Sequence, residues 1–301
     1  MGWRAFCLPV EGAQLAGEVR DGEGTPLVLV HGFGGSRAMW DAVIAALPAD
    51  LPLVRYDLRG FGASAQDEAV PFRHADDLLA VLDHLGIAQV HLCGLSMGGA
   101  IAVRFAIERA DRVARLVLVS PALIAWEWSA DWAAGFRACV KAARSGDMAT
   151  ARRLWWENPL FDTVREEPFA AALQAEIAAF AGRQWMADPQ MRELPEVEHL
   201  HRLTAPTLLL AGGRDTADFR LIADMLSATV PDLRRIDYPD AGHMLTLERP
   251  ADLAGEIAAF LGGRVGPPRG TGPPGSIVRS CRSPPVRPSD SAPCPAGCSS
   301  R

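Results

Sequence analysis

The stretch CGLSMGG, Cys93–Gly99, places one serine between glycines near the middle of the chain. Its Gly-x-Ser-x-Gly pattern is short, so by itself it indicates either a reactive serine or a small polar residue in a glycine-rich loop. The preceding residues, VHLC, have the apolar character of a strand, and the residues MGGAIAVRFAIE that follow Ser96 have the pattern of a helix. Ser96 is therefore predicted to lie at a strand-to-helix turn.

A serine at such a turn takes up a strained backbone conformation, which is tolerated only where the residues two positions away on either side are very small. Gly94 and Gly98 meet this need, and Gly99 eases the packing of the helix against the strand. The free N–H groups and positive dipole at a helix N-terminus suit a developing oxyanion. This context favours Ser96 as a nucleophile and the backbone N–H of Met97 as an oxyanion donor.

A serine nucleophile needs a base, and His243 is the preferred candidate. It lies in PDAGHMLTLERP, in a loop predicted between the last strand and the final helix. His31 ends a predicted strand beside a glycine loop, so we expect it near the site in a structural role. The remaining histidines fall inside or at the edges of predicted helices and strands, namely His74, His84, His91, His199 and His201.

The base in turn needs a carboxylate that orients it. Asp215 follows a predicted strand in LLLAGGRD and is preferred. Asp218 suits the N-cap of the helix FRLIADMLSATV better, and Asp240 is too close to His243 in the chain to reach the far nitrogen of its ring. The predicted constellation is Ser96, Asp215 and His243.

The loop HGFGGS, His31–Ser36, is predicted to supply the second oxyanion donor, the backbone N–H of Phe33. Alone, this stretch fits a flexible glycine turn equally well, but its combination with the serine turn favours the functional interpretation. The stretch YDLRGFGAS, Tyr56–Ser64, predicts a turn framed by salt bridges, in which Asp57 and Arg59 are structural rather than catalytic.

Short apolar runs alternate with helical patterns along the first 120 residues. Strands are predicted for PLVLVHG, LPLVRYDLRG, AQVHLCG and VARLVLVS, and helices for SRAMWDAVIAAL, with Ser36 as N-cap, and HADDLLAVLDHLG, which Gly86 would end. Strands resume with APTLLLAGG and LRRIDYP, and the last helix opens at Pro250 and stops at Gly262–Gly263. This rhythm predicts an α/β fold with a parallel sheet and helices on both faces.

Residues 121–198 interrupt the rhythm with helical segments and no convincing strand. We interpret them as a helical cap over one end of the sheet, inserted into a core formed by residues 1–120 and 199–264. Six of the eight tryptophans lie in the cap, and five of them are candidates for lining an apolar substrate pocket: Trp126, Trp128, Trp132, Trp155 and Trp156. Aromatic residues at helical spacing are more often core packing, so both interpretations stay open.

Composition excludes several other classes of protein. The chain carries a formal charge of −6, and residues 1–264 carry −10, which argues against nucleic-acid binding. The N-terminus lacks the apolar run of a signal peptide, and no stretch suggests a membrane span, so a cytoplasmic protein is expected. Three cysteines of the body (Cys7, Cys93 and Cys139) are expected to be free thiols.

The segment from Val265 to Arg301 is different, because 21 of its 37 residues are Pro, Gly or Ser. Such a segment cannot bury enough apolar surface to offset its ordering entropy, so it is predicted to be disordered.

The pieces HGFGGS, YDLRGFGAS, CGLSMGG, GGRD and AGHM, in this order and spacing, resemble the α/β-hydrolase superfamily from about Gly24 to Leu261. The resemblance implies a mostly parallel eight-stranded sheet flanked by helices, with the helical cap inserted after the sixth strand. It also implies the triad order Ser96, Asp215, His243 and a reaction that needs neither metal nor organic cofactor.

Within the superfamily the resemblance is less specific. CGLSMGG with RYDLRGFGAS looks like the 3-oxoadipate enol-lactonases, which act on a small anionic lactone, and GHMLTLERP looks like many esterases. Carbon–carbon hydrolases of meta-cleavage pathways usually carry tryptophan where this chain has Met244, and haloalkane dehalogenases and epoxide hydrolases have aspartate where it has Ser96.

The sequence therefore predicts a serine hydrolase of small-molecule carboxylic esters or lactones. A ligand-binding receptor on a hydrolase scaffold is the alternative from another class, and the oligomeric state is left open.

Overall fold

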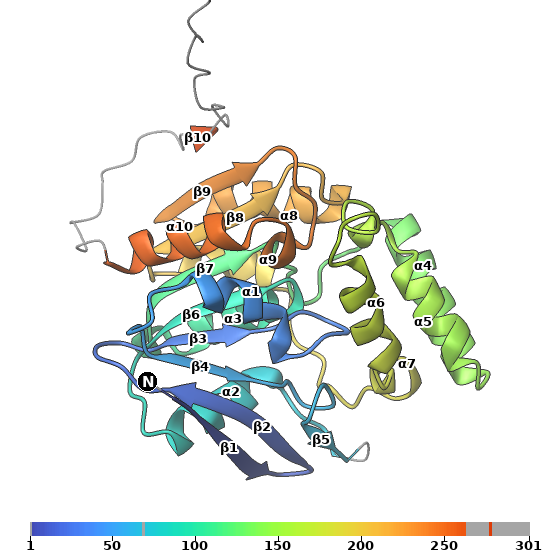
Figure 1. Ribbon diagram of the computed structural model, residues 1–301, viewed down its shortest axis with the longest axis horizontal. Coiled ribbons are helices and arrows are strands. Elements are labelled where there is room, and N and C mark those ends of the chain that lie inside the picture. Colours follow the sequence, from blue (N-terminus) through green and yellow to red (C-terminus); the bar gives the residue numbers. More distant parts are fainter. Residues whose placement is uncertain (1, 68–69, 263–276, 279–301) are drawn as a thin grey trace, which may run out of the picture.

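The computed structural model describes residues 2–67, 70–262 and 277–278. One sheet runs through the centre in the strand order β1-β2-β4-β3-β6-β7-β8-β9-β10, and β5 pairs with β2 outside this path (Figure 1). Its strands are β1 (Trp3–Val10), β2 (Ala13–Arg20), β3 (Leu27–Val30), β4 (Leu53–Tyr56), β5 (Ala65–Gln66), β6 (Val90–Leu95), β7 (Val113–Val119), β8 (Thr207–Gly212), β9 (Leu233–Tyr238) and β10 (Ile277–Val278).

The sheet is parallel from β4 to β10 in this order, whereas β2 runs antiparallel to β1, β4 and β5. The predicted eight-stranded, mostly parallel sheet is confirmed in β1–β4 and β6–β9, and the dipeptide strands β5 and β10 extend it. The antiparallel hairpin of β1 and β2 was not among the strands assigned from the sequence.

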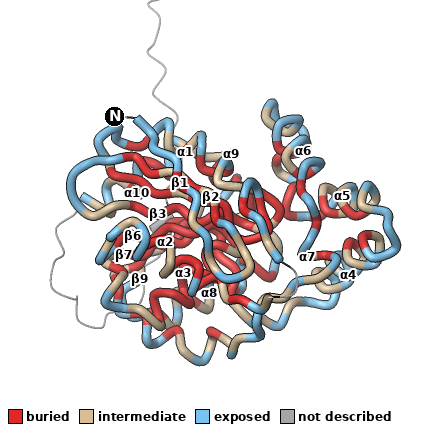
Figure 2. The backbone as a smooth tube through the Cα atoms, turned by 90° about the horizontal axis from the view of Figure 1, so that it is seen from below, coloured by how far each residue is buried: buried red, intermediate tan, exposed pale blue. Residues whose placement is uncertain are grey.

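The central strands are buried on both faces, as their continuous apolar runs predict. All residues of β3 and β8 are buried, and β6 and β7 each have a single half-buried residue, His91 and Ala114. Figure 2 shows buried residues concentrated in the interior of the molecule, around the labelled strands β3, β6 and β7. A rigid frame of this kind fixes the loops at the carboxyl ends of its strands.

Helices cover both faces of the sheet (Figure 1). One face carries α1, α9 and α10, which pack against one another, and the other carries α2, α3 and α8. Their bounds are α1 (Asp41–Ala46), α2 (His74–His84), α3 (Met97–Glu108), α8 (Ala217–Thr229), α9 (Leu245–Glu248) and α10 (Pro250–Gly262). None of the helices in the described part of the chain is long and apolar enough to cross a membrane.

Two helices begin where the sequence predicts, and a third begins at a different residue. Ser36 caps the 3-10 helix η1 (Arg37–Trp40) that leads into α1, and Pro250 opens α10, both as predicted. The prediction that Asp218 is an N-cap is wrong, because α8 begins at Ala217 with Thr216 as its N-cap residue. Asp218 lies in the first turn of the helix, where its carboxylate is free to bind another segment.

A long connection joins β7 to β8, and we call its residues, 120–206, the inserted segment. It holds α4 (Ala130–Arg144), α5 (Met148–Trp156), α6 (Ala170–Ala179), α7 (Arg183–Met186) and two 3-10 helices, η3 (Pro159–Phe161) and η4 (Glu196–Arg202). The segment itself contains no strand. Its helices project to one side of the sheet in Figures 1 and 2. The domain boundaries at 120 and 199 stay predictions, and the predicted disorder of residues 265–301 lies outside the described residues, apart from the β10 dipeptide.

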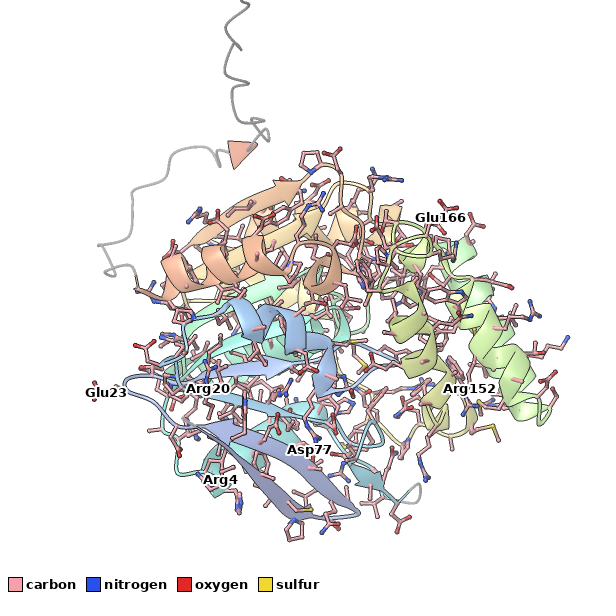
Figure 3. The ribbon with its side chains drawn as sticks, in the orientation of Figure 1. Arg4, Arg20, Glu23, Asp77, Arg152 and Glu166 are labelled. Atoms are coloured by element: carbon pink, nitrogen blue, oxygen red, sulfur yellow. The ribbon has the colours of Figure 1, made fainter. Side chains whose placement is uncertain are left out.

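Charged side chains mostly surround this body, but a few lie inside it. In Figure 3, Arg4, Glu23 and Glu166 lie at the periphery, whereas Asp77, a residue of α2, lies further inside. Asp77 accepts two hydrogen bonds from the guanidinium of Arg59, at 2.9 and 2.7 Å, and both side chains are buried. Such a buried pair holds the loop after β4 against α2 and agrees with the structural role expected for Arg59.

Candidate active site

Ser96 lies between the end of β6 and the start of α3, at the turn predicted from the sequence. Its backbone has φ 53° and ψ −116°, a left-handed region that non-glycine residues rarely occupy. The strain is fixed by neighbouring backbone, because Ser96 N–H donates to Val119 O at 3.0 Å and Ser96 O accepts from Ala122 N–H at 2.9 Å. The turn therefore presents the Ser96 side chain at the carboxyl end of the sheet.

The glycines around Ser96 are needed for close approach of backbone to backbone. A Cβ atom at Gly94 would collide with the carbonyl of Gly98, and one at Gly98 would collide with the carbonyl of Val30 in β3. A Cβ atom at Gly99 would come within 2.6 Å of Pro121 Cβ. The expected requirement for small residues on both sides of Ser96 thus has a definite cause, the packing of α3 onto β3 and β6.

His243 and Asp215 meet although 28 residues separate them in the chain. His243 lies between β9 and α9, and its Nδ1 is 2.8 Å from Asp215 Oδ2, with both side chains 3% exposed. The other carboxylate oxygen of Asp215 accepts from Thr216 N–H at 2.7 Å. Because a carboxylate only accepts hydrogen bonds, Nδ1 carries a proton, and in the neutral imidazole Nε2 then has the lone pair.

Asp218, the second acid considered, binds elsewhere. Its carboxylate accepts hydrogen bonds from the backbone N–H and the hydroxyl of Ser129, at 3.0 and 2.6 Å. Ser129 is the N-cap residue of α4, so Asp218 ties the inserted segment to α8. Of the two acids, the structure brings Asp215 to His243.

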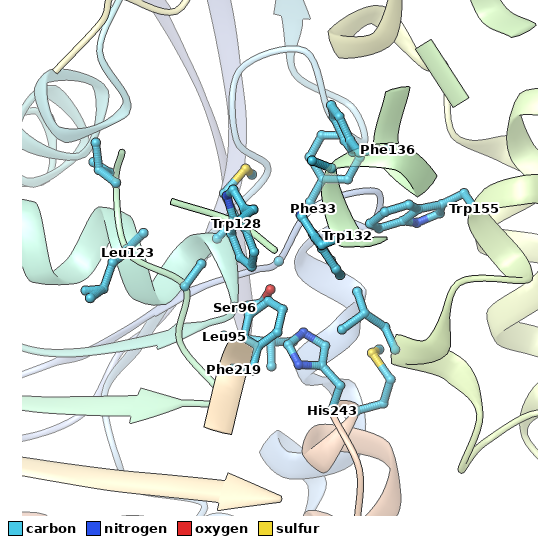
Figure 4. Close-up of a pocket in the computed structure, with 18 of the residues that line it drawn as sticks. Phe33, Leu95, Ser96, Leu123, Trp128, Trp132, Phe136, Trp155, Phe219 and His243 are labelled. Atoms are coloured by element: carbon cyan, nitrogen blue, oxygen red, sulfur yellow. The ribbon is translucent and has the colours of Figure 1, made fainter. Parts of the chain in front are cut away.

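Ser96 and His243 line the same pocket, where Figure 4 draws them next to one another. The Ser96 hydroxyl makes no hydrogen bond to the residues described, so it can rotate toward Nε2 of His243. Hydrogen bonds between a nucleophile and its base commonly tighten only when substrate is bound. Phe219, on α8, covers the imidazole with a ring-centroid distance of 4.3 Å and shields it from water.

Two backbone N–H groups beside Ser96 are available to an anion. Met97 is the first residue of α3, so its N–H has no partner within the helix. The N–H of Phe33, in the loop after β3, likewise meets no acceptor among the residues described. Both residues line the pocket together with Ser96, as the sequence predicts for a pair of oxyanion donors.

His31 holds the loop that carries the Phe33 N–H. Its Nε2 accepts from Leu58 N–H at 2.9 Å, which leaves the proton on Nδ1, 2.8 Å from Gly32 O. Burial lowers the pKa of His31, so the ring is neutral. Since Gly32 O and Phe33 N–H belong to one peptide plane, this bond orients the N–H, and His31 has the structural role expected of it.

Asp57 also serves as a structural residue. Its carboxylate accepts from the backbone N–H groups of Arg37 and Ala63, at 2.8 and 2.9 Å, and pairs with the Arg37 guanidinium. These contacts join the loop after β3 to the loop after β4. They agree with the prediction that the YDLRGFGAS stretch frames the site without taking part in it.

The pocket between the sheet and the inserted segment has a volume of about 480 Å³. Aromatic rings make up much of its wall: Phe33, Trp128, Trp132, Phe136, Trp155, Phe161 and Phe219. Trp128 and Trp132 stack with centroids 4.7 Å apart (Figure 4). A wall of this kind suits an apolar substrate group.

Three of the five predicted pocket tryptophans line this pocket, and two do not. Trp128, Trp132 and Trp155 do so, whereas Trp126 and Trp156 are not among its lining residues. Trp156 follows Trp155 on α5, so it points about 100° away around the helix, and it stacks on Phe161. Trp126 packs against the core from the start of the inserted segment.

Phe136 and Phe219 were missed as lining residues, although both carried a signal. Phe136 is four residues after Trp132 on α4, on the same helix face. Phe219 stands next to Asp218 in the first turn of α8, close in sequence to Asp215. Among the described residues, no group of three or more His, Cys, Asp and Glu side chains could hold a metal ion.

A buried acid supports one wall of the pocket. Glu196 is fully buried, accepts from Ile124 N–H through Oε2 at 2.6 Å, and donates its own N–H to Ile124 O at 3.3 Å. Its Oε1 is 3.6 Å from Arg104 Nε, which lies closer to Glu193, at 3.2 Å. Ile124 and Ala125 line the pocket, and Glu196 joins the first residues of the inserted segment to its last.

Glu196 predicts a pH dependence of stability. Burial raises its pKa from 4.5 to about 8, against the weaker attraction of Arg104. Between these values the folded protein binds a proton that the unfolded chain releases, so the free energy of unfolding falls as pH rises through this interval. We expect Glu196→Gln to flatten this fall and to be about 2 kcal/mol more stable than the wild type at pH 8.

The measurement is urea unfolding at pH 5, 6, 7 and 8, with Glu198→Gln on the exposed side of η4 as the matched control. Glu198→Gln should follow the wild-type curve throughout. If the curves of Glu196→Gln and the wild type stay parallel, Glu196 is ionised in the folded protein and the prediction is wrong.

Comparison with known proteins gives a family match over most of the chain. A family profile described as alpha/beta hydrolase fold matches residues 25–250. The structure of a thermophilic esterase from Thermogutta terrifontis is similar with a TM-score of 0.72 and 28% identity, over 86% of this chain and 98% of the esterase.

Relatives that are named for different activities match over similar lengths of this chain. The dihydrolipoyllysine-residue acetyltransferase component of the acetoin cleaving system of Pseudomonas putida is 33% identical over 79% of this chain, which spans 64% of that protein's length. The 3-oxoadipate enol-lactonase 1 of Acinetobacter baylyi is 26% identical, over 83% of this chain and 94% of the lactonase. Haloalkane dehalogenase 2 of Mycobacterium tuberculosis is 31% identical, over 81% of this chain and 90% of the dehalogenase.

Proposed function

This chain is a member of the alpha/beta hydrolase fold family, and from that premise we propose that it is a serine hydrolase of carboxylic esters or lactones that works through an acyl-enzyme. The observation that carries the proposal is the buried hydrogen bond of 2.8 Å between His243 and Asp215, beside a serine held at φ 53° in an apolar pocket. This set of groups is what acyl transfer requires: a nucleophile, a base with its lone pair toward the site and a carboxylate that fixes the tautomer.

In the proposed reaction, Ser96 Oγ attacks the substrate carbonyl while Nε2 of His243 takes its proton. Asp215 stabilises the imidazolium, and the N–H groups of Phe33 and Met97 receive the oxyanion. The C–O bond to the leaving group then breaks as the imidazolium returns the proton to the departing oxygen. Water, deprotonated by His243, attacks the acyl-enzyme, and collapse of the second tetrahedral intermediate releases the acid and restores Ser96.

Lactone hydrolysis follows the same steps, with the alcohol still attached to the acyl group. The similarity to an enol-lactonase over 94% of its length supports this variant of the proposal. Similarity to a haloalkane dehalogenase points to a different reaction, in which an alkyl group is transferred to the nucleophile. That nucleophile is an aspartate in the dehalogenases, at the position of Ser96. A serine hydroxyl with an adjacent base suits attack on a carbonyl, so the ester and lactone proposal is preferred.

Carbon–carbon bond hydrolysis and a receptor without catalysis are the remaining alternatives. Met244 follows His243 where the carbon–carbon hydrolases of the superfamily usually carry tryptophan. A receptor would retain tightly a ligand that it hardly turns over, and it has no need of the complete set Ser96, Asp215 and His243.

The test is covalent trapping of the nucleophile together with transient kinetics. With p-nitrophenyl acetate we expect a burst of one nitrophenolate per protein, because a weakly basic leaving group makes deacylation the slow step. A fluorophosphonate should phosphonylate Ser96 with loss of fluoride, and peptide mass spectrometry should find the adduct on the peptide containing CGLSMGG. Labelling of another residue, or steady turnover with the serine unlabelled, would contradict the proposal.

A further inference from the structure

The charge balance of the pocket is one-sided. Apart from His243, Arg137 is the only side chain with an ionisable group among the lining residues, and neither Asp nor Glu is one of them. A pocket that binds amines would be expected to have a negatively charged side chain in its lining. A pocket for a wholly apolar ester would be expected to have no charged side chain there. A cation against an aromatic wall indicates a substrate that is apolar along most of its length and anionic at one point.

Arg137 is available to bind a ligand. It makes no hydrogen bond or ion pair with the residues that the structure describes, in contrast to the buried arginines Arg59 and Arg104, which are paired with carboxylates. Its side chain is exposed at the rim of the pocket, so water solvates the guanidinium in the free protein. A ligand anion placed there needs no rearrangement of existing ion pairs.

The position of Arg137 sets it apart from the reacting groups. It follows Phe136 on α4, and Phe136 meets the ring of Phe33 edge to face at 5.7 Å. Figure 4 shows Phe136 and His243 at opposite ends of the pocket, with Phe33 and Trp132 between them. An extended substrate with its carbonyl at Ser96 therefore meets aromatic rings as it runs toward α4, the helix that carries Arg137.

We propose that the substrates are esters or lactones whose apolar body ends in a carboxylate, and that the guanidinium of Arg137 binds this carboxylate. The proposal rests on the proposed function and adds the substrate class. A planar guanidinium suits a carboxylate because two parallel N–H···O bonds can form. The aromatic rings bind the body of the substrate, and Arg137 selects its charged end.

The test compares two esters of equal chain length, p-nitrophenyl hydrogen suberate and p-nitrophenyl octanoate, on the wild type and on Arg137→Gln. The ratio of kcat/KM for the anionic ester to that for the neutral ester should fall about tenfold in Arg137→Gln, through KM. Raising the salt concentration should reduce the wild-type ratio in the same direction.

Lys141→Gln is the matched control, because Lys141 lies one turn further along α4 and does not line the pocket. It removes the same charge from the same helix, and the ratio should stay within twofold of the wild type. An equal loss for both esters in Arg137→Gln, or an equal fall of the ratio in Lys141→Gln, would overturn the role of Arg137.

A binding measurement separates this inference from the chemistry. Calorimetry on Ser96→Ala, which should not hydrolyse the ligands, should give tighter binding of the monomethyl ester of suberate than of the methyl ester of octanoate, and adding Arg137→Gln should abolish the difference. If neither ester turns over but the suberate ester is preferred through Arg137, the proposed hydrolysis fails and the anion site stands. If both esters turn over and the suberate ester is not preferred, the inference is wrong and the hydrolase proposal stands.

Discussion

Replacing Ser96 with alanine is expected to lower kcat for p-nitrophenyl butyrate by about ten-thousand-fold to a million-fold. The remaining rate should be only slightly above the uncatalysed rate. The substitution removes the atom that forms the acyl-enzyme, so the burst phase should vanish together with the steady rate. The measurement is nitrophenolate release at protein concentrations high enough to detect the residual rate.

Ser120→Ala is the matched control for this experiment. Ser120 directly follows the neighbouring strand β7, also has a positive φ, 39°, and does not line the pocket. Its replacement should leave kcat within a few-fold of the wild type. Thermal unfolding of both variants shows whether the fold is intact. A folded Ser96→Ala protein that keeps one per cent of the wild-type kcat would exclude Ser96 as the nucleophile.

The central strands and the serine turn could be predicted because their causes are local. β3, β6 and β8 are buried almost throughout, so their sequences are mostly apolar and can be identified as strands without knowledge of the strands beside them. The turn at Ser96 needs glycine at positions 94 and 98 because α3 packs closely onto β3 and β6. Both glycines lie within two residues of Ser96, so a short sequence pattern is enough to recognise the turn.

The β1–β2 hairpin was missed because its pattern is weak. β1 is largely exposed, and glycine interrupts β2 at position 17, where the ring of Phe6 covers the backbone. Neither strand has a continuous apolar run or a strict alternation. The pairing of Phe6 with Gly17 across the hairpin becomes visible only once the two strands are aligned.

Contacts between segments that are distant in the chain are the part of the site that could not be predicted from the sequence. Thr216 and Asp218 are both residue types that cap helices, and both stand at the start of α8. Asp218 instead binds the inserted segment, because the fold brings Ser129 next to it. Glu196 likewise depends on Ile124, 72 residues away. Such partners leave no local pattern.

Asp215→Asn is expected to lower kcat/KM by about ten-thousand-fold while the pocket stays intact. The asparagine amide can direct its NH₂ group to Nδ1 of His243, which then becomes the acceptor and moves the ring proton to Nε2. A protonated Nε2 faces Ser96 as a donor and cannot accept the hydroxyl proton, so the base is lost although every heavy atom keeps its place. The measurement is kcat/KM for the same butyrate ester, with folding checked by thermal unfolding.

Asp218→Asn distinguishes this cause from a general loss of negative charge. Asp218 lies three residues away, is also buried, and binds Ser129 instead of the imidazole. We expect its replacement to lower kcat/KM by less than about tenfold, through a looser attachment of α4, and to lower the melting temperature by about 2–4 °C. A larger loss of activity in Asp218→Asn than in Asp215→Asn would assign the orienting carboxylate to Asp218. It would also mean that the 2.8 Å contact between Asp215 and His243 is structural, because only the carboxylate that fixes the tautomer can cost the enzyme its base.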